Sequence, residues 1–258
     1  MASTYETGCI QNVANLETLI SYITAFGTDY NPSKNSLTIP ELQKILSEAK
    51  VSLNTVNVAF SAHSNATAAR ESAFEPLSKL VTRANNALKA TDTTTQVDDS
   101  AKTIVRKLQG SRANAKITEE EKKALEAEGK AVNQISVSQM GFNDRLENFD
   151  KFITLLSSIP NYAPNEEDLK ITSLSAYRDS LKAKNSDVLP TEVQLSNARI
   201  ARNEIQDKPL TGLVDIALDT KTYIKSVFGA TSPQYKQISK LAFVKQKVVS
   251  KSIPSMML

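Results

Sequence analysis

Residues 30–42 read YNPSKNSLTIPEL, and 132 positions later residues 162–174 read YAPNEEDLKITSL. The same offset places SNATAAR at 64–70 on SNARIAR at 196–202. After one inserted residue, PLSKLVTRA at 76–84 matches PLTGLVDIA at 209–217, and VRKL at 105–108 matches ISKL at 238–241. Matches in this order, with a single one-residue slip, indicate an internal duplication. The sequence therefore predicts two copies, at roughly 16–110 and 148–243.

The composition favours helices in both copies. The 258 residues include only seven Gly, no Trp and 6% aromatic residues. Sheets need Gly in their tight turns and aromatic or β-branched residues on their faces. We therefore expect an all-α protein made of two similar helical-bundle repeats joined by a long linking helix.

Apolar spacing and proline positions predict the helices of the first copy. An opening helix at about 10–26 precedes a polar loop at 30–36, and Pro40 suits the first turn of a long helix that continues towards Phe74. Shorter helices follow at about 77–90 and 98–108. We expect six leucines to be buried in the two copies: Leu42, Leu77, Leu80, Leu174, Leu210 and Leu213.

The second copy repeats this plan with two differences. Pro190 predicts a break in its long helix, and Pro209 is expected to open the next helix. That helix should end at Phe228, with Gly229 following it, and Ser232 and Pro233 should begin the last one.

Between the copies, a capping box at 118–121 precedes an apolar stripe that runs from Leu125 to Leu156. We expect one long helix here that becomes the first helix of copy two, although the stripe could also mediate dimerisation. The predicted domains are a first helical bundle (1–110), a linking helix (111–147), a second bundle (148–243) and a basic extended tail (244–258).

Several segments resemble a known family. They are LVTR at 80–83, NALK at 86–89, SNARIAR at 196–202, TGLVD at 211–215 and YIKSVFGATSPQYK at 223–236. In these residues the chain resembles a widespread family of uncharacterised, internally duplicated helical proteins from Bacteroidota bacteria. The resemblance covers most of the chain. It implies a bacterial origin and assigns no activity to any residue.

The residues that carry catalysis are scarce. Cys9 and His63 are the only cysteine and histidine, too few for a disulfide or a zinc cage. No glycines cluster into a phosphate-binding loop. The acidic groups at 98–99, 119–121 and 166–168 stand at expected helix starts, where carboxylates complement the helix dipole. We predict no catalytic, metal-binding or cofactor-binding residue, and no enzyme.

The motif Ser-Asn-Ala-x-x-Ala-Arg is present in both copies. Its small residues let helices approach closely, while Asn65, Arg70, Asn197 and Arg202 offer directional hydrogen bonds. We interpret the motif as structural pairing, with a duplicated binding surface as the alternative.

Charge is unevenly distributed along the chain. After Asp219 there are seven lysines and no acidic residue. Because the whole chain carries a net charge of +3, residues 1–219 together carry a net charge of about −4. Tyr223, Phe228, Tyr235 and Phe243 alternate with the lysines, a pattern that nucleic-acid-binding proteins show. The extended tail is a candidate assembly arm that docks on an acidic neighbouring subunit through Lys245, Lys247, Val248, Val249, Lys251 and Ile253.

Taken together, these patterns favour a non-enzymatic structural or interaction protein that assembles with itself or with another protein. A nucleic-acid-binding protein that uses the basic C-terminal third is the alternative, and a membrane-active helical protein is disfavoured. The N-terminus lacks the features of a secretory signal, and no apolar run approaches the ~20 residues of a membrane span. We expect a cytoplasmic protein without membrane insertion, with unconventional export left open.

Overall fold

The computed structural model describes residues 4–111, 123, 127 and 140–245. Across these residues the chain is helical and contains no strand, which confirms the all-α class. The α-helices are α1 (Thr4–Ala25), α2 (Ile39–Phe74), α3 (Leu77–Lys89), α4 (Thr95–Leu108), α6 (Phe142–Ser157), α7 (Ile171–Ser186), α8 (Val188–Asp207), α9 (Leu213–Phe228) and α10 (Pro233–Ser239). Short 3-10 helices lie at Gly27–Asp29, Asn35–Leu37 and Glu167–Leu169.

The chain forms two compact units, and each contains residues from both predicted copies. Unit 1 consists of residues 1–63 and 192–258, and unit 2 of residues 64–191. Unit 1 therefore combines the N-terminal part of copy one with the C-terminal part of copy two. Unit 2 combines the C-terminal part of copy one with the N-terminal part of copy two. This division differs from the predicted bundles at 1–110 and 148–243, because α2 and α8 each carry the chain from one unit into the other.

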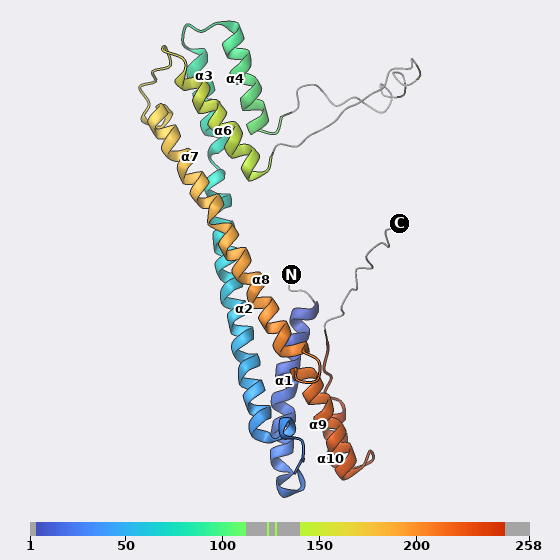
Figure 1. Cartoon of the computed structure of the whole chain (residues 1–258). Coiled ribbons are helices and arrows are strands. Elements are labelled where there is room, and N and C mark those ends of the chain that lie inside the picture. Colours follow the sequence, from blue (N-terminus) through green and yellow to red (C-terminus); the bar gives the residue numbers. More distant parts are fainter. Residues whose placement is uncertain (1–3, 112–122, 124–126, 128–139, 246–258) are drawn as a thin grey trace, which may run out of the picture. The chain divides into compact units, whose positions relative to one another are not determined.

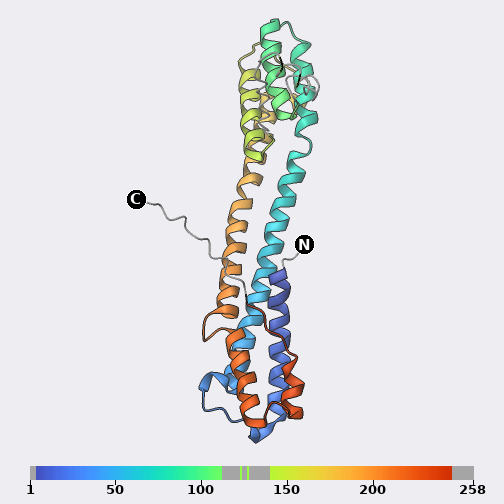
Figure 2. The ribbon, with the colours of Figure 1, turned by 90° about the vertical axis from the view of Figure 1, so that its right-hand side faces the viewer.

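The core of unit 1 joins α1 and the start of α2 to α9 and α10 (Figures 1 and 2). On α1 the buried residues recur at steps of three and four, as one face of a helix requires. The core residues of these helices are Val13, Leu16, Leu19, Ile20, Ile23, Leu42, Ile45, Ala49, Leu213, Val214, Ile216, Ala217, Ile224 and Ile238.

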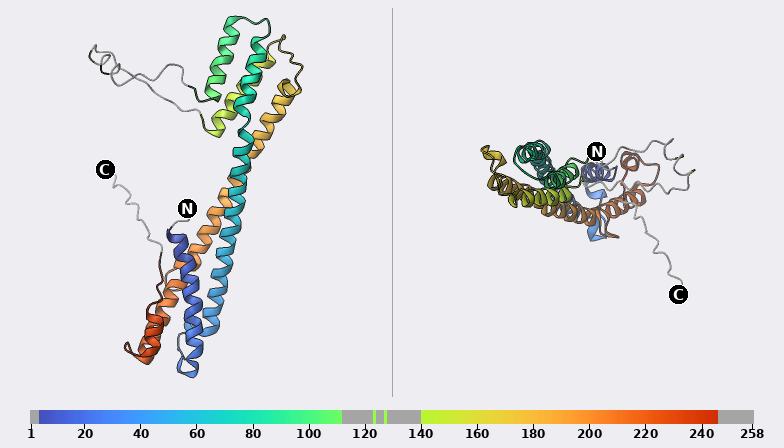
Figure 3. Two further views of the ribbon diagram at one scale, coloured as in Figure 1. Left: turned by 180° about the vertical axis from the view of Figure 1, so that it is seen from behind. Right: turned by 90° about the horizontal axis from the view of Figure 1, so that it is seen from above.

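The core of unit 2 gathers around α6, against which both α4 and α7 lie (Figure 3). Three phenylalanines and several leucines fill it, together with the end of α2 and the buried face of α3. The core residues of these helices are Phe74, Leu77, Val81, Ala84, Leu88, Ala101, Val105, Leu108, Phe149, Phe152, Ile153, Leu156, Leu174 and Leu181.

A buried tyrosine closes the loop before α2 in unit 1 and the equivalent loop before α7 in unit 2. The Tyr30 hydroxyl donates to the Leu37 carbonyl oxygen at 2.5 Å, and the Tyr162 hydroxyl donates to the Leu169 carbonyl oxygen at 2.9 Å. Burial is the main cause that raises the pKa of each tyrosine to about 12. The α2 and α7 helices then begin 132 residues apart, at Ile39 and Ile171. These matches support the duplication, which stays a prediction for the copies as wholes.

Proline and glycine place several helix ends as the sequence predicts. Helix α2 runs unbroken to Phe74, whereas its counterpart is interrupted at Asp187, between α7 and α8. The ring of Pro190 would clash with the carbonyl group of Ser186, four residues earlier, which explains the break. Gly229 follows Phe228 with φ of 87°, and the Ser232 hydroxyl caps α10 by accepting from the Tyr235 amide at 3.1 Å.

The start of α9 differs from the prediction. Pro209 does not open this helix, which begins at Leu213. Leu210 is 77% exposed and has a φ of 68°, so the prediction of its burial was wrong. A Cβ on Gly212 would lie 2.6 Å from the Lys208 backbone nitrogen, and the Asp215 carboxylate accepts from the Leu210 amide at 3.0 Å. This tight turn delays the helix.

The other five leucines that were predicted to be buried differ in how completely they are buried. Leu42, Leu77, Leu174 and Leu213 are fully buried, as expected, while Leu80 is only partly buried at the edge of the unit 2 core.

The predicted linking helix is not continuous with the first helix of copy two. Helix α6 begins at Phe142, because Gly141 has an extended backbone with ψ of 149° and Met140 is not helical. Glycine loses more conformational freedom in a helix than any other residue, which favours a break here. Most of the predicted helix at 111–147 lies outside the described residues.

Candidate interaction sites

The two arginines of the repeated motif have different surroundings. Arg202, on α8 in unit 1, is only 3% exposed, lies 3.9 Å from the Glu6 carboxylate and donates to the Asn203 side chain at 2.9 Å. Arg70, on α2 in unit 2, is half-buried and lies 4.0 Å above the centre of the Phe142 ring. Each arginine therefore contacts the first turn of the opening helix of the other copy, α6 for Arg70 and α1 for Arg202, which supports the structural interpretation.

The asparagines and small residues of the motif separate as well. Asn65 and Asn197 are both exposed on their helices. Ala198 packs on a small cluster of Val56, Ala59 and Leu195, where α8 lies against α2 within unit 1. The small side chain of Ala198 thus allows α8 and α2 to approach closely at this point. The roles of Asn65 and Asn197 stay predictions.

A segment after α10 is held on α1 by side-chain amides, a site that the sequence analysis missed. The Asn12 side chain donates to the Val244 carbonyl oxygen and accepts from the Val244 amide, both at 2.8 Å. Asn15 donates to the Ala242 carbonyl oxygen at 2.6 Å. Asn12 also donates to the Gln206 side chain of α8 at 3.1 Å. We call residues 241–245 the strap.

Buried amides explain how α1 binds the strap. Asn12 and Gln206 are fully buried and Asn15 nearly so, so each must find partners inside the unit. An asparagine side chain has two N–H donors and a carbonyl oxygen, so one N–H and the oxygen can pair with a peptide group while the second N–H binds another acceptor. An asparagine side chain can therefore hydrogen-bond to an extended backbone whatever side chains that backbone carries. Two asparagines three residues apart within an apolar stripe were the available sequence signal.

Lysines fix the strap and the chain before it. The Lys245 ammonium lies 2.5 Å from the Asp215 carboxylate, and this hydrogen bond is the main cause that lowers the pKa of Asp215. Lys221 donates to the carbonyl oxygens of Ser239 and Leu241, and burial lowers its pKa. Lys245 thus pairs within its own chain, not with the neighbouring subunit that the sequence suggested. Lys247, Val248, Val249, Lys251 and Ile253 lie outside the described residues.

The aromatic residues of the basic third pack into unit 1. Tyr223, Phe228, Tyr235 and Phe243 are partly buried against its core. The Tyr223 ring meets the Tyr30 ring edge-on at 5.4 Å, and the Phe228 ring lies 5.2 Å from that of Phe26. Stacking on nucleobases needs free ring faces, which these contacts reduce.

Exposed apolar side chains are concentrated in unit 1. Among the described residues, ten of the twelve large exposed apolar side chains belong to unit 1 and two to unit 2. Those of unit 1 are Ile10, Val51, Val58, Phe60, Val193, Ile200, Leu210, Leu218, Val227 and Val244, and those of unit 2 are Met140 and Leu189.

Two outer helix faces carry part of this set. Val51 and Val58 lie seven residues apart on α2, and we call them the α2 face. Val193 and Ile200 lie seven residues apart on α8, and with the exposed Glu204 we call them the α8 face. Residues seven apart share one side of a helix, so each pair forms a short stripe.

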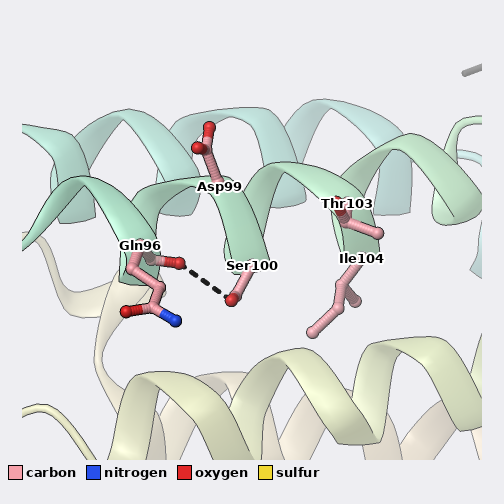
Figure 4. Close-up of a pocket in the computed structure, with 5 residues that line it drawn as sticks. All are labelled: Gln96, Asp99, Ser100, Thr103 and Ile104. Atoms are coloured by element: carbon pink, nitrogen blue, oxygen red, sulfur yellow. Dashed lines mark hydrogen bonds between the residues drawn. The ribbon is translucent and has the colours of Figure 1, made fainter.

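The remaining candidate sites show little chemistry. Cys9 is fully buried, and a thiol in apolar surroundings is a poor nucleophile. The part of the chain that the structure describes holds no group of acidic, cysteine or histidine side chains placed to bind a metal ion. A shallow pocket is lined by five residues that all come from α4, including Asp99, Thr103 and Ile104 (Figure 4).

None of the described helices is both long and apolar enough to span a membrane. No protein-family model, curated protein or solved structure matches this chain. The resemblance to a Bacteroidota family therefore stays a prediction.

Proposed function

We propose that the protein is a non-enzymatic structural and interaction protein that assembles with itself or with another protein through unit 1. One observation carries the proposal: the exposed large apolar side chains of the described residues are concentrated in unit 1. Apolar side chains that gather on one part of a surface are typical of protein–protein contacts. Scattered surface residues would divide evenly between two units of similar size.

The α2 face is the most suitable contact for a partner helix. Val51 and Val58 point away from Val56 and Ala59, which are buried on the other side of α2. A pair of β-branched residues seven apart fits the seam between two packed helices. A second copy of the chain offers the same pair, so a two-fold contact is the simplest assembly.

Light scattering on the purified chain tests the proposal. We expect a mass above the 28.2 kDa of one chain, and a fall towards that mass in the Val51→Lys/Val58→Lys variant. Leu189→Lys, at an equally exposed apolar site in unit 2, is the matched control and should leave the mass unchanged. A wild-type mass of one chain at every concentration contradicts self-assembly, and an equal fall in the control contradicts the assignment to α2.

The nucleic-acid alternative has less support. Lys221 and Lys245 are bound within the chain, and the interleaved aromatic rings pack on the unit 1 core. Lys236 and Lys240 are exposed and could contact phosphate groups. Fluorescence anisotropy with labelled single-stranded and duplex oligonucleotides, on wild type and Lys236→Glu/Lys240→Glu, would promote this function if salt-sensitive binding is found and lost in the variant.

A further inference from the structure

One stripe of α2 has the residue spacing of a contact between two packed helices. Its members follow one another at alternating steps of four and three residues, which is the pattern that paired helices share along their seam. They lie on one side of α2 within unit 1, and all are exposed except the last, which is partly exposed. The members are Lys44, Glu48, Val51, Thr55, Val58 and Ala62, and we call them the α2 seam.

The centre of the α2 seam is suited to burial by another helix. No residue from 51 to 62 is charged, and Lys44 and Glu48 supply charge only at the N-terminal end of the seam. The Thr55 hydroxyl donates to the Val51 carbonyl oxygen of its own helix at 3.0 Å. Because this hydroxyl already has a partner, covering Thr55 leaves no unpaired donor. A centre without charged side chains is typical of protein–protein interfaces.

Side-chain size distinguishes the two ways in which a second copy can pack on the α2 seam. In a parallel pair each residue meets its own counterpart, so Val51 meets Val51 and Val58 meets Val58. In an antiparallel pair Val51 of each copy meets Ala62 of the other, and Val58 meets Thr55. The antiparallel pair thus avoids two layers of valine on valine and places Val51 against the smallest side chain of the seam, which lets the helices interdigitate.

Charge favours the same orientation. A parallel pair brings the two Lys44 side chains together, and likewise the two Glu48 side chains, and such like-charge contacts penalise that pairing. In the antiparallel pair the two Glu48 side chains lie about 26 Å apart along the helix axis, and the two Lys44 side chains lie farther apart still. This separation exceeds the ~10 Å over which charges interact at 0.1 M salt.

We infer that two copies of the chain pack α2 on α2 in antiparallel orientation, with Val51 of each copy on Ala62 of the other. The inference rests on the proposed self-assembly and adds the orientation and register of the contact. Two-fold symmetry repeats every contact, so the layers of Val58 on Thr55 lie nearest the symmetry axis.

Disulfide formation between introduced cysteines tests the orientation in the full chain. Isotope-labelled chains with Val51→Cys are mixed with unlabelled chains with Ala62→Cys and oxidised, and the mass of each covalent dimer identifies its members. Cys9 is fully buried and does not take part. We expect the mixed dimer as the main covalent product. In the antiparallel pair the two copies of position 51 lie about 17 Å apart, whereas a disulfide needs Cβ atoms about 4 Å apart.

The products separate failure of the orientation from failure of self-assembly. Covalent dimers of Val51→Cys with itself, in place of the mixed dimer, indicate a parallel pair and overturn the inference while self-assembly stands. Mixed dimers no more abundant than those with Leu189→Cys, the exposed control in unit 2, also overturn it if light scattering still shows a mass above one chain. A mass of one chain at every concentration contradicts the proposed function and the inference together.

Charge substitution gives a second measurement of the same register by light scattering. Val51→Glu should lower the mass towards that of one chain, and adding Ala62→Lys should raise it again, because the antiparallel pair brings the two new charges together across the seam. In a parallel pair the double variant sets glutamate against glutamate and lysine against lysine, so its mass stays low. A double variant with no larger mass than Val51→Glu overturns the inference. Circular dichroism on each variant separates loss of the contact from loss of helix.

Discussion

Units 1 and 2 tie equivalent loops to equivalent helices with ion pairs of opposite polarity. In unit 1, Lys34 of the loop before α2 lies 2.6 Å from Asp219 of α9. In unit 2 the loop before α7 supplies the acid, and Asp168 pairs with Arg83 of α3. Each pair joins a loop from one predicted copy to a helix from the other.

The reversed polarity indicates how the chain selects its helix partners. If each copy packed on itself, Lys34 would approach Arg83 and Asp168 would approach Asp219, which are like charges. Each exposed ion pair contributes only ~0–1 kcal/mol to stability, but a like-charge contact penalises the wrong pairing by a similar amount. Both pairs together thus favour the arrangement in which each unit combines two copies.

The largest difference between aligned positions is expected at Leu77 and Leu210. Leu77→Ala removes a fully buried side chain from the unit 2 core and should lower the free energy of unfolding by ~2–5 kcal/mol. Leu210→Ala, at the exposed counterpart in unit 1, should cost less than ~0.5 kcal/mol. Chemical denaturation measures both. Equal costs would mean that the turn before α9 is placed wrongly.

The two motif arginines should differ next. Arg202→Ala removes a nearly fully buried side chain and its hydrogen bonds to Asn203, while Glu6 keeps its closer contact with Arg199, and we expect a loss of ~2 kcal/mol. Arg70→Ala removes the stacking of a half-buried side chain on Phe142 and should cost ~1 kcal/mol. Thermal unfolding of both variants provides the ranking. A larger loss of stability in Arg70→Ala than in Arg202→Ala would contradict the prediction that the more buried arginine contributes more.

The two buried tyrosines should respond alike to alkaline pH. Their pKa in the fold is about 12, above the 10.0 of an unfolded tyrosine, so the fold favours the protonated hydroxyl. Their contribution to stability is therefore complete below pH 10 and is lost as pH rises towards 12. Denaturation between pH 9 and 12 should show this loss, and the Tyr30→Phe/Tyr162→Phe variant should show less of it. An unchanged pH dependence in the variant rejects the assignment.

The smallest effect is expected at the ion pairs that distinguish the units. Lys34→Glu should lower the free energy of unfolding by ~0.5–1 kcal/mol through repulsion of Asp219, and adding Asp219→Lys should restore it. High salt should weaken both effects because these side chains are exposed. A double variant no more stable than the single one would show that the two charges do not interact.

The sequence predicted where the helices of this fold begin and end better than which helices pack against each other. The continuity of α2, the break before Pro190 and the end of α9 at Gly229 follow from the backbone limits of single residues. The turn at Leu210 was missed because a one-residue insertion moved the helix start without changing the apolar pattern. The pairing of α1 with α9 was missed because α3 offers a similar apolar face, and only the charges near residues 34 and 168 distinguish them.

The candidate sites were harder to predict for the same reason. Nothing local separates Arg202 from Arg70, because burial depends on the helix that lies opposite. Asn12 and Asn15 read as ordinary polar residues until the strap is placed beside them.

Cutting the chain between the copies tests the central claim, that each unit is built from both. Cleavage at a protease site placed within residues 112–139 divides the chain into two fragments, one that contains residues 1–111 and one that contains residues 140–258. Because each unit takes helices from both fragments, we expect them to remain associated at the mass of the whole chain, with unchanged helix content, until denaturant separates them. Fragments that separate in native buffer while each keeps its helices would show that the copies fold as independent bundles.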